Sequence, residues 1–258
     1  MSENNIINLK DFSNGFGLEH PSVQKVIKIA ENIVSQNKTL DVETLYNRAK
    51  RILQIPRKGL LRIIQMLINR KILIEGSKYT RRSVLNNPLR KTLYFFIKEN
   101  LGAHFSDIRK NVFTPGDQDD LGSAGQFIWH LEMLLKFKYI KKIKVKNFTV
   151  FIPIEVSDEV GELYFILRDD LNRKIVELIR NSGPLQRSDV YKNLEEKRET
   201  IYYRINNLVE LDLLEIDEER GNQIRINPQK KEKMSMILKD FWQTEKNLIA
   251  LSADGGLE

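Results

Sequence analysis

Residues 89–110 read LRKTLYFFIKENLGAHFSDIRK, and residues 171–192 read LNRKIVELIRNSGPLQRSDVYK. The two segments align without a gap at a constant offset of 82 residues. Leu89 aligns with Leu171, and Ser106-Asp107-Ile108 aligns with Ser188-Asp189-Val190. A self-match of this length indicates a structural unit that the chain repeats.

The apolar spacing that follows each segment also recurs, and it recurs a third time nearer the N-terminus. Such spacing is typical of an amphipathic helix that ends and runs into a strand. The sequence therefore predicts three repeats, at residues 20–80, 88–155 and 169–228. The matching residues are Leu131, Leu134, Phe137, Tyr139 and Ile140; Ile205, Leu208, Leu211, Leu213 and Leu214; and Ile64, Leu67, Ile72 and Leu73, with Arg70 interrupting the pattern.

Each repeat is expected to run helix, short strand, helix, helix, β hairpin, which is the order of a helix-turn-helix with a wing. The predicted fold class is therefore mostly α, with three tandem α+β winged-helix domains. In the first repeat Asp41 is a candidate N-cap, and the hairpin is the weakest element. A C-terminal amphipathic helix is expected at residues 230–251. The expected helices include residues 22–35, 57–69, 88–100, 106–112, 124–137, 171–181, 188–194 and 199–209; the expected strands include residues 71–74, 103–105, 139–145, 148–152, 213–217 and 223–226.

Composition narrows the class of protein. The 258 residues are 41% hydrophobic and 30% charged, which is ordinary for a soluble globular chain. The chain has no cysteine, so disulfides and thiolate metal sites are excluded. No apolar run approaches the roughly 18 residues needed to cross a bilayer. We expect a cytoplasmic, nucleoid-associated protein without a membrane partner.

The net charge of +7 is unevenly distributed along the chain. Residues 1–87 carry 15 Lys and Arg against 7 Asp and Glu, and residues 88–157 carry 11 against 7. Residues 158–228 reverse the balance, with 11 against 16. Positive potential attracts polyanions such as nucleic acid, so the asymmetry predicts a division of labour between the repeats.

The second repeat resembles archaeal winged-helix transcriptional regulators. The resemblance is carried by Asn87-Pro88-Leu89-Arg90, His104-Phe105-Ser106-Asp107-Ile108, Ile128-Trp129-His130-Leu131 and Tyr139-Ile140. The third repeat, with Ile201-Tyr202-Tyr203-Arg204-Ile205, is similar to the same broad family. The resemblance implies tandem winged-helix domains, binding to double-stranded DNA and a role in transcription regulation.

The third helix of a winged helix enters the major groove, where Arg, Lys, Asn and Gln read base edges. Residues off the apolar stripe of that helix are therefore candidate DNA contacts, the alternative being an ordinary solvated helix face. Arg81 and Arg82 follow the first repeat and are candidates for contact with the phosphate backbone. The candidates on the third helices are Arg57, Lys58, Arg62 and Gln65 in the first repeat, and Ser123, Gln126 and Trp129 in the second.

The expected hairpin of the second repeat is rich in lysine. Alternate residues of a strand share a face, so Lys142, Lys144 and Lys146 are expected to project together. Three ammonium groups on one face suit a phosphate backbone and carry no sequence information. The alternative is that these lysines prevent aggregation at an edge strand.

The third repeat is a poorer DNA reader because Glu195, Glu196 and Glu199 surround its third helix. We expect a protein contact there instead, with Tyr202 and Tyr203 as anchors, or with one of the two tyrosines in the core. The C-terminal stripe is expected either to form a homodimer together with this repeat or to pack back on its own repeat. Its residues are Met234, Leu238, Phe241 and Leu248.

No catalytic or cofactor signature is present in the sequence. None of His20, His104 and His130 has the spacing of a zinc protease, and no phosphate-binding glycine loop occurs. We therefore expect a non-enzymatic protein without cofactor or metal. The competing hypotheses are a protein-interaction scaffold of tandem winged helices, of the endosomal-sorting or transcription-complex type, and an RNA-binding protein.

Overall fold

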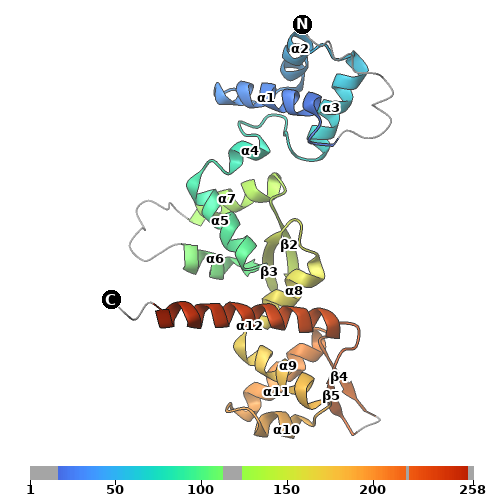
Figure 1. Ribbon diagram of the computed structural model, residues 1–258, viewed down its shortest axis with the longest axis vertical. Coiled ribbons are helices and arrows are strands. Elements are labelled where there is room, and N and C mark those ends of the chain that lie inside the picture. Colours follow the sequence, from blue (N-terminus) through green and yellow to red (C-terminus); the bar gives the residue numbers. More distant parts are fainter. Residues whose placement is uncertain (1–16, 113–123, 219–220, 255–258) are drawn as a thin grey trace. The chain divides into compact units, whose positions relative to one another are not determined.

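The computed structural model describes residues 17–112, 124–218 and 221–254. The chain is mostly helical with two small sheets (Figure 1). It divides into two compact units: the first comprises the described residues up to Phe96 together with those between Ile108 and Lys141, and the second comprises Ile97–Asp107 and the described residues from Lys142 onward. The expected loop at residues 114–122 lies outside the described residues.

The first compact unit contains the three helices of the first repeat. They are α1 (Pro21–Ser35), α2 (Val42–Ile52) and α3 (Arg57–Asn69). Asp41 caps α2, as predicted, by accepting a hydrogen bond from the backbone N–H of Thr44 at 2.7 Å. The three helices enclose one apolar core, which includes Val26, Ile33, Leu45, Leu60, Ile64 and Leu67. The same unit holds the short α4 (Arg81–Val84), most of α5 (Pro88–Glu99) and α7 (Ala124–Lys136).

The strand predicted at residues 71–74 is wrong, because the structure has no strand among the described residues of the first repeat. The chain turns there, and Ile72 and Leu73 are buried in the core of the three helices. The turn that follows is bonded to Leu40, whose N–H donates to Ser77 O at 2.8 Å and whose carbonyl accepts from Gly76 N at 2.7 Å. The β propensity of these residues was overridden by burial of two adjacent apolar side chains.

The second compact unit contains both sheets. The strands β1 (Ala103–His104), β3 (Phe148–Pro153) and β2 (Ile140–Val145, its first two residues belonging to the first unit) form one antiparallel sheet in the order β1-β3-β2. The strands β4 (Leu214–Asp217) and β5 (Gln223–Ile226) form the other sheet. The remaining helices are α6 (Phe105–Val112, divided between the units), α8 (Asp158–Leu167), α9 (Asp170–Ser182), α10 (Arg187–Lys192), α11 (Arg198–Glu210) and α12 (Lys231–Asp254).

The offset of 82 residues in the sequence has a counterpart in the backbone. Ala103 pairs with Phe151 of β3, and its equivalent Leu185 forms a β-bridge with Ile224 of β5. Two residues earlier, Leu101 and Gly183 both have positive φ, at 50° and 81°. The turn from the first helix of the repeat into its short extended segment is therefore built in the same way twice.

All three repeats share the same exit from their third helix. Lys71, Lys138 and Asp212 have φ values of 57°, 53° and 59°. The next residue in each repeat donates its N–H to the carbonyl five residues back, from Ile72 to Leu67, Tyr139 to Leu134 and Leu213 to Leu208, each at 2.9 Å. This is the left-handed helix cap in which glycine is the usual residue. The three repeats recognised in the sequence thus have a shared backbone geometry at this point.

Replacing Lys71 with glycine is expected to stabilise the protein by about 1 kcal/mol, because glycine adopts this positive φ without the steric cost of a Cβ atom. Lys71 is exposed, and its side chain makes no ion pair or hydrogen bond with the described part of the chain. Lys71→Ala is the matched control, since alanine removes the same side chain but keeps the Cβ. Urea denaturation of the three proteins measures the difference, and equal midpoints for the glycine and alanine variants would contradict the assignment.

The helix α8 was not predicted. It begins at an N-cap, Ser157, whose hydroxyl accepts from Val160 N, and its residues Gly161, Leu163, Tyr164, Ile166 and Leu167 are buried. A Cβ on Gly161 would lie only 2.7 Å from Cγ2 of Ile152, so the absence of a side chain lets α8 pack against β3. This helix joins the hairpin of the second repeat to the third repeat.

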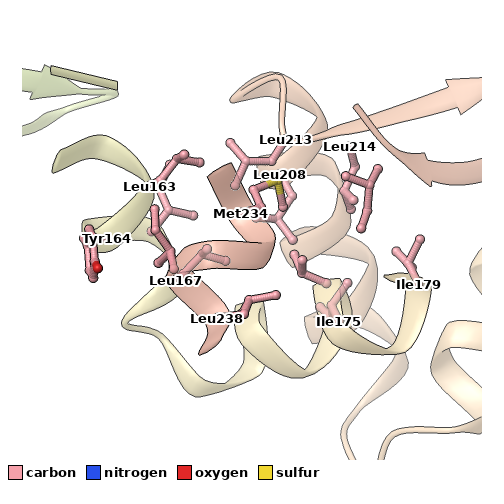
Figure 2. Packing of buried hydrophobic residues seen from close by; sticks show 14 of the residues in the cluster. Leu163, Tyr164, Leu167, Ile175, Ile179, Leu208, Leu213, Leu214, Met234 and Leu238 are labelled. Atoms are coloured by element: carbon pink, nitrogen blue, oxygen red, sulfur yellow. The ribbon is translucent and has the colours of Figure 1, made fainter. Parts of the chain in front are cut away.

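One continuous apolar core results in the second compact unit. It runs from Ile143 and Val150 of the sheet, through α8, to the third repeat and α12. Figure 2 shows Leu163 and Leu167 of α8 beside Met234 and Leu238 of α12, with Leu208 and Leu213 behind them. The exposed fractions of Met234 and Leu238 are 1% and 0%. These two residues of the predicted C-terminal stripe therefore pack on their own chain.

Candidate nucleic-acid interface

The cationic face of α3 is the clearest candidate surface in the first compact unit. The helices α2 and α3 are joined by the short segment 53–56, as in a helix-turn-helix. Gly59, Leu60, Ile63, Ile64 and Leu67 turn one side of α3 into the core. The opposite side carries the predicted residues, all of them exposed: Arg57, Lys58, Arg62 and Gln65.

These cations have no partner within the described residues. The side chains of Arg57, Lys58 and Arg62 make no ion pair there, and the first turn of α3 holds no acidic residue. Gln65 donates to Asn69 Oδ1 at 3.0 Å along the same face. Arg57 and Lys58 also lie at the helix N-terminus, where the helix dipole adds to the attraction for phosphate.

Leu61 was not recognised from the sequence. It lies one turn from Arg57 and from Gln65, and 43% of its surface is exposed. Its spacing of four residues from Arg57 and from Gln65 was a usable signal, because both of those residues were predicted to lie off the core stripe. An apolar side chain between base-reading residues can contact a thymine methyl group.

Of the two arginines after the first repeat, Arg82 is exposed and has no partner in the described ranges. Arg81 is half-buried, lies 5.0 Å above the ring of Tyr139, and donates to the carbonyl of Lys138 at 3.2 Å. The hydroxyl of Tyr139 donates back to Arg81 O at 2.7 Å, and burial raises the pKa of this phenol. Arg81 thus fastens α4 to the exit of α7.

The candidates on α7 are differently placed. Gln126 is exposed, whereas Ser123 lies outside the described residues. Trp129 is 45% exposed, but its ring stacks on the guanidinium of Arg90 at 5.3 Å and meets Tyr79 edge-on at 6.4 Å. His130 is half-buried, and burial is the main cause that lowers its pKa. The indole of Trp129 is therefore committed to holding Arg90.

The lysines of the hairpin are exposed, as strand alternation predicts, but one of them is engaged. Lys146 donates to Asn207 Oδ1 at 2.6 Å and pairs with Glu210 at 2.7 Å, both on α11. Lys142 lies 5.8 Å above the ring of Phe151. Lys144 is exposed on β2 and forms no ion pair with any residue that the structure describes.

The third helix of the third repeat, α11, uses its arginines internally. Arg204 pairs with Asp169 at 2.8 Å, and Arg198 lies 5.0 Å above the ring of Tyr202. Tyr202 is half-buried against the core, whereas Tyr203 is 63% exposed. Of the two tyrosines expected at an interface, only Tyr203 faces outward to this extent.

The C-terminal stripe is likewise internal. Met234 and Leu238 are buried, Phe241 packs against the same core, and Arg173 lies 5.0 Å above its ring. Leu248 falls within α12, but its side chain lies outside the described residues. Of the alternatives for this stripe, packing on its own repeat describes the first three residues.

No group of three or more His, Asp or Glu side chains is arranged to hold a metal ion in the part of the chain that the structure describes. In that same part, no helix is both long enough and apolar enough to span a membrane.

Comparison with known proteins gives one relevant relative. The chain is 27% identical over 170 residues to an uncharacterized HTH-type transcriptional regulator of Methanocaldococcus jannaschii. The match covers 65% of this chain and 41% of the relative, so the chain spans less than half of that protein's length. No family model matches the chain. The relative is a distant homologue named for the helix-turn-helix class that the α2–α3 pair also suggests.

Proposed function

We propose that this protein is a DNA-binding transcriptional regulator, and that α3 is its principal reading helix. The observation that carries the proposal is the exposed face of Arg57, Lys58 and Arg62 on the second helix of a helix-turn-helix, three cations that have no partner among the described residues. The distant regulator of Methanocaldococcus jannaschii supports the same class. Gln65 and Leu61 would add a hydrogen-bonding and an apolar contact to base edges.

We further propose that the repeats at residues 88–155 and 169–228 are winged-helix domains, and that the repeat at residues 20–80 is a helix-turn-helix domain without a wing. The shared exit from the third helix supports this architecture, as do the hairpins of the second and third repeats. In this proposal Lys144 contacts a phosphate. The contrast between α3 and α11 supports DNA binding by the first repeat rather than the third, because the arginines of α11 already interact within the chain.

The proposal is tested with the full chain and a library of random duplexes. Rounds of selection are expected to enrich one sequence motif, and binding to that duplex is expected to fall steeply with salt, because bound lysines and arginines displace condensed counterions. The measurement is the dissociation constant at several salt concentrations, beside a scrambled duplex of the same length. Absence of binding at low salt, or equal affinity for both duplexes, would refute sequence-specific recognition.

A protein-interaction scaffold is the second candidate, and Tyr203 is the observation that favours it. This aromatic side chain is 63% exposed on α11, within an acidic repeat. Aromatic residues are enriched at protein interfaces. A scaffold would bind one stoichiometric protein partner, lose it on Tyr203→Ala, and show the same DNA affinity before and after loss of the arginines on α3.

A further inference from the structure

A pocket of about 600 Å³ lies in the first compact unit, away from the exposed face of α3. One wall is the C-terminal half of α1, with Glu31 and Ser35, and the other is the segment from Lys78 through α4 to the start of α5. Its volume is in the range that small-molecule sites occupy. The lining residues that matter below are Glu31, Lys78, Arg82 and Arg90.

The lining carries three cationic side chains and one carboxylate. Lys78 and Arg82 are exposed, and neither makes an ion pair among the described residues. A carboxylate at the rim of a pocket would normally pair with a neighbouring cation, but no described carboxylate is paired with Lys78 or Arg82. The uncompensated positive charge is available to a ligand.

Arg90 is the unusual member of this group, because only 3% of its surface is exposed. Its Nε donates to Val84 O at 2.7 Å, and its guanidinium lies against the rings of Tyr79 and Trp129, 4.9 and 5.3 Å from their centroids. Its Nη1 is buried and has no hydrogen-bond acceptor. Burial lowers the pKa of Arg90, which reflects the cost of a buried cation without a counter-charge.

A buried guanidinium is normally paired with a carboxylate or an anionic ligand. Glu31, the carboxylate of this pocket, forms no ion pair with Arg90. The Oε1 atom of Glu31 is also buried and accepts no hydrogen bond from the described residues. The walls are also fixed in position, because Thr80 and Ser83 form a reciprocal cap at the start of α4. The pocket is therefore preorganised around an unmatched positive charge.

We infer that this pocket binds a small anionic ligand, through a carboxylate or phosphate group that Arg90, Lys78 and Arg82 hold together. The guanidinium supplies directional donors and the two outer cations supply charge. The inference does not depend on DNA binding, because the site is defined by residues outside α3.

The test is a titration of the ¹⁵N-labelled full chain with sodium phosphate and, separately, with sodium acetate, followed by NMR. Each titration is compared with sodium chloride at the same ionic strength. Saturable shifts of the backbone amides at residues 79–83 are expected with at least one of the two anions. Saturable shifts with phosphate alone would indicate a ligand that bears a phosphate group, and saturable shifts with acetate alone would indicate a carboxylate ligand. Saturable shifts with both anions would indicate that the pocket accepts either group.

Two variants make the assignment specific. Lys78→Ala/Arg82→Ala is expected to weaken binding at least about tenfold, because charge-assisted hydrogen bonds contribute on this scale. Lys50→Ala/Arg51→Ala removes the same charge from exposed positions on α2 and should leave binding unchanged. Glu31→Gln is expected to tighten binding several-fold, because it removes a repulsive carboxylate. Shifts that do not saturate, or that are equal in all variants, would overturn the inference.

Discussion

Replacing both Arg57 and Arg62 with alanine is expected to weaken binding of the full chain to its selected duplex about 100-fold at about 0.1 M salt, since each contact of this kind contributes about 1–3 kcal/mol. Both side chains are exposed and have no partner within the described residues, so their loss should not disturb the fold. If they contact phosphates, the slope of log K against log salt should fall by about 2. If they read bases, discrimination against a mismatched duplex should fall while the slope changes less.

The control removes the same charge from exposed positions on another helix of the first repeat. Lys25 and Lys28 lie on α1, and Lys25→Ala/Lys28→Ala lowers the net charge equally. A surface that attracts DNA only through overall charge would respond equally to both double variants. Equal losses of affinity in the two double variants would therefore contradict the proposal that α3 is the reading helix. The proposal would also be contradicted if the Arg57→Ala/Arg62→Ala protein kept both its circular-dichroism spectrum and its affinity for DNA.

Replacing Leu238 with alanine is expected to lower the free energy of unfolding by about 3 kcal/mol, the usual cost of emptying a leucine site in a packed core. Leu238 is fully buried between α12 and the rest of its own unit, beside Leu163 and Leu167 of α8 (Figure 2). Chemical denaturation followed by circular dichroism measures the loss. Met236 lies two residues away on the same helix and is 51% exposed, so Met236→Ala is the matched control and should change stability little.

The dependence on protein concentration separates the two readings of the C-terminal helix. Packing within one chain predicts the same loss at every concentration, because unfolding is then unimolecular. A dimer held together by Leu238 predicts a midpoint that rises with concentration in the parent protein and loses this dependence in the variant. A midpoint that depends on concentration in this way would show that α12 packs on a second copy of the chain instead of on its own.

The sequence predicted the elements whose signals are local. Helix α3 was expected at residues 57–69 and is found at Arg57–Asn69, because Pro56, the apolar stripe and the break at Arg70 all act within that segment. The short α4 was missed because its cap, Thr80 with Ser83, encloses a single turn. Helix α8 was missed because its buried residues run almost continuously and show no helical stripe, although Ser157 followed by two acidic residues was a usable N-terminal signal.

The predicted binding residues were harder to judge from the sequence, because tertiary contacts decide which of their side chains remain accessible to a partner. The lysines on the hairpin were expected to act together, but Glu210, far away in the sequence, takes Lys146. The two adjacent tyrosines differ because helix rotation turns Tyr202 toward the core and Tyr203 outward. The pocket around Arg90 could not be predicted, because it depends on the packing of α1 against a segment fifty residues later.

The continuous core around α8 has a consequence for how the chain unfolds. Domains in tandem usually each have their own hydrophobic core, so that one can be lost or gained without unfolding its neighbours. Here a chain that stopped before the third copy would leave Leu163, Ile166 and Leu167 without most of the partners that shield them from water. The last two repeats are therefore expected to unfold together, and a deletion that also removed α8 would uncover Val150 and Ile152 of the sheet.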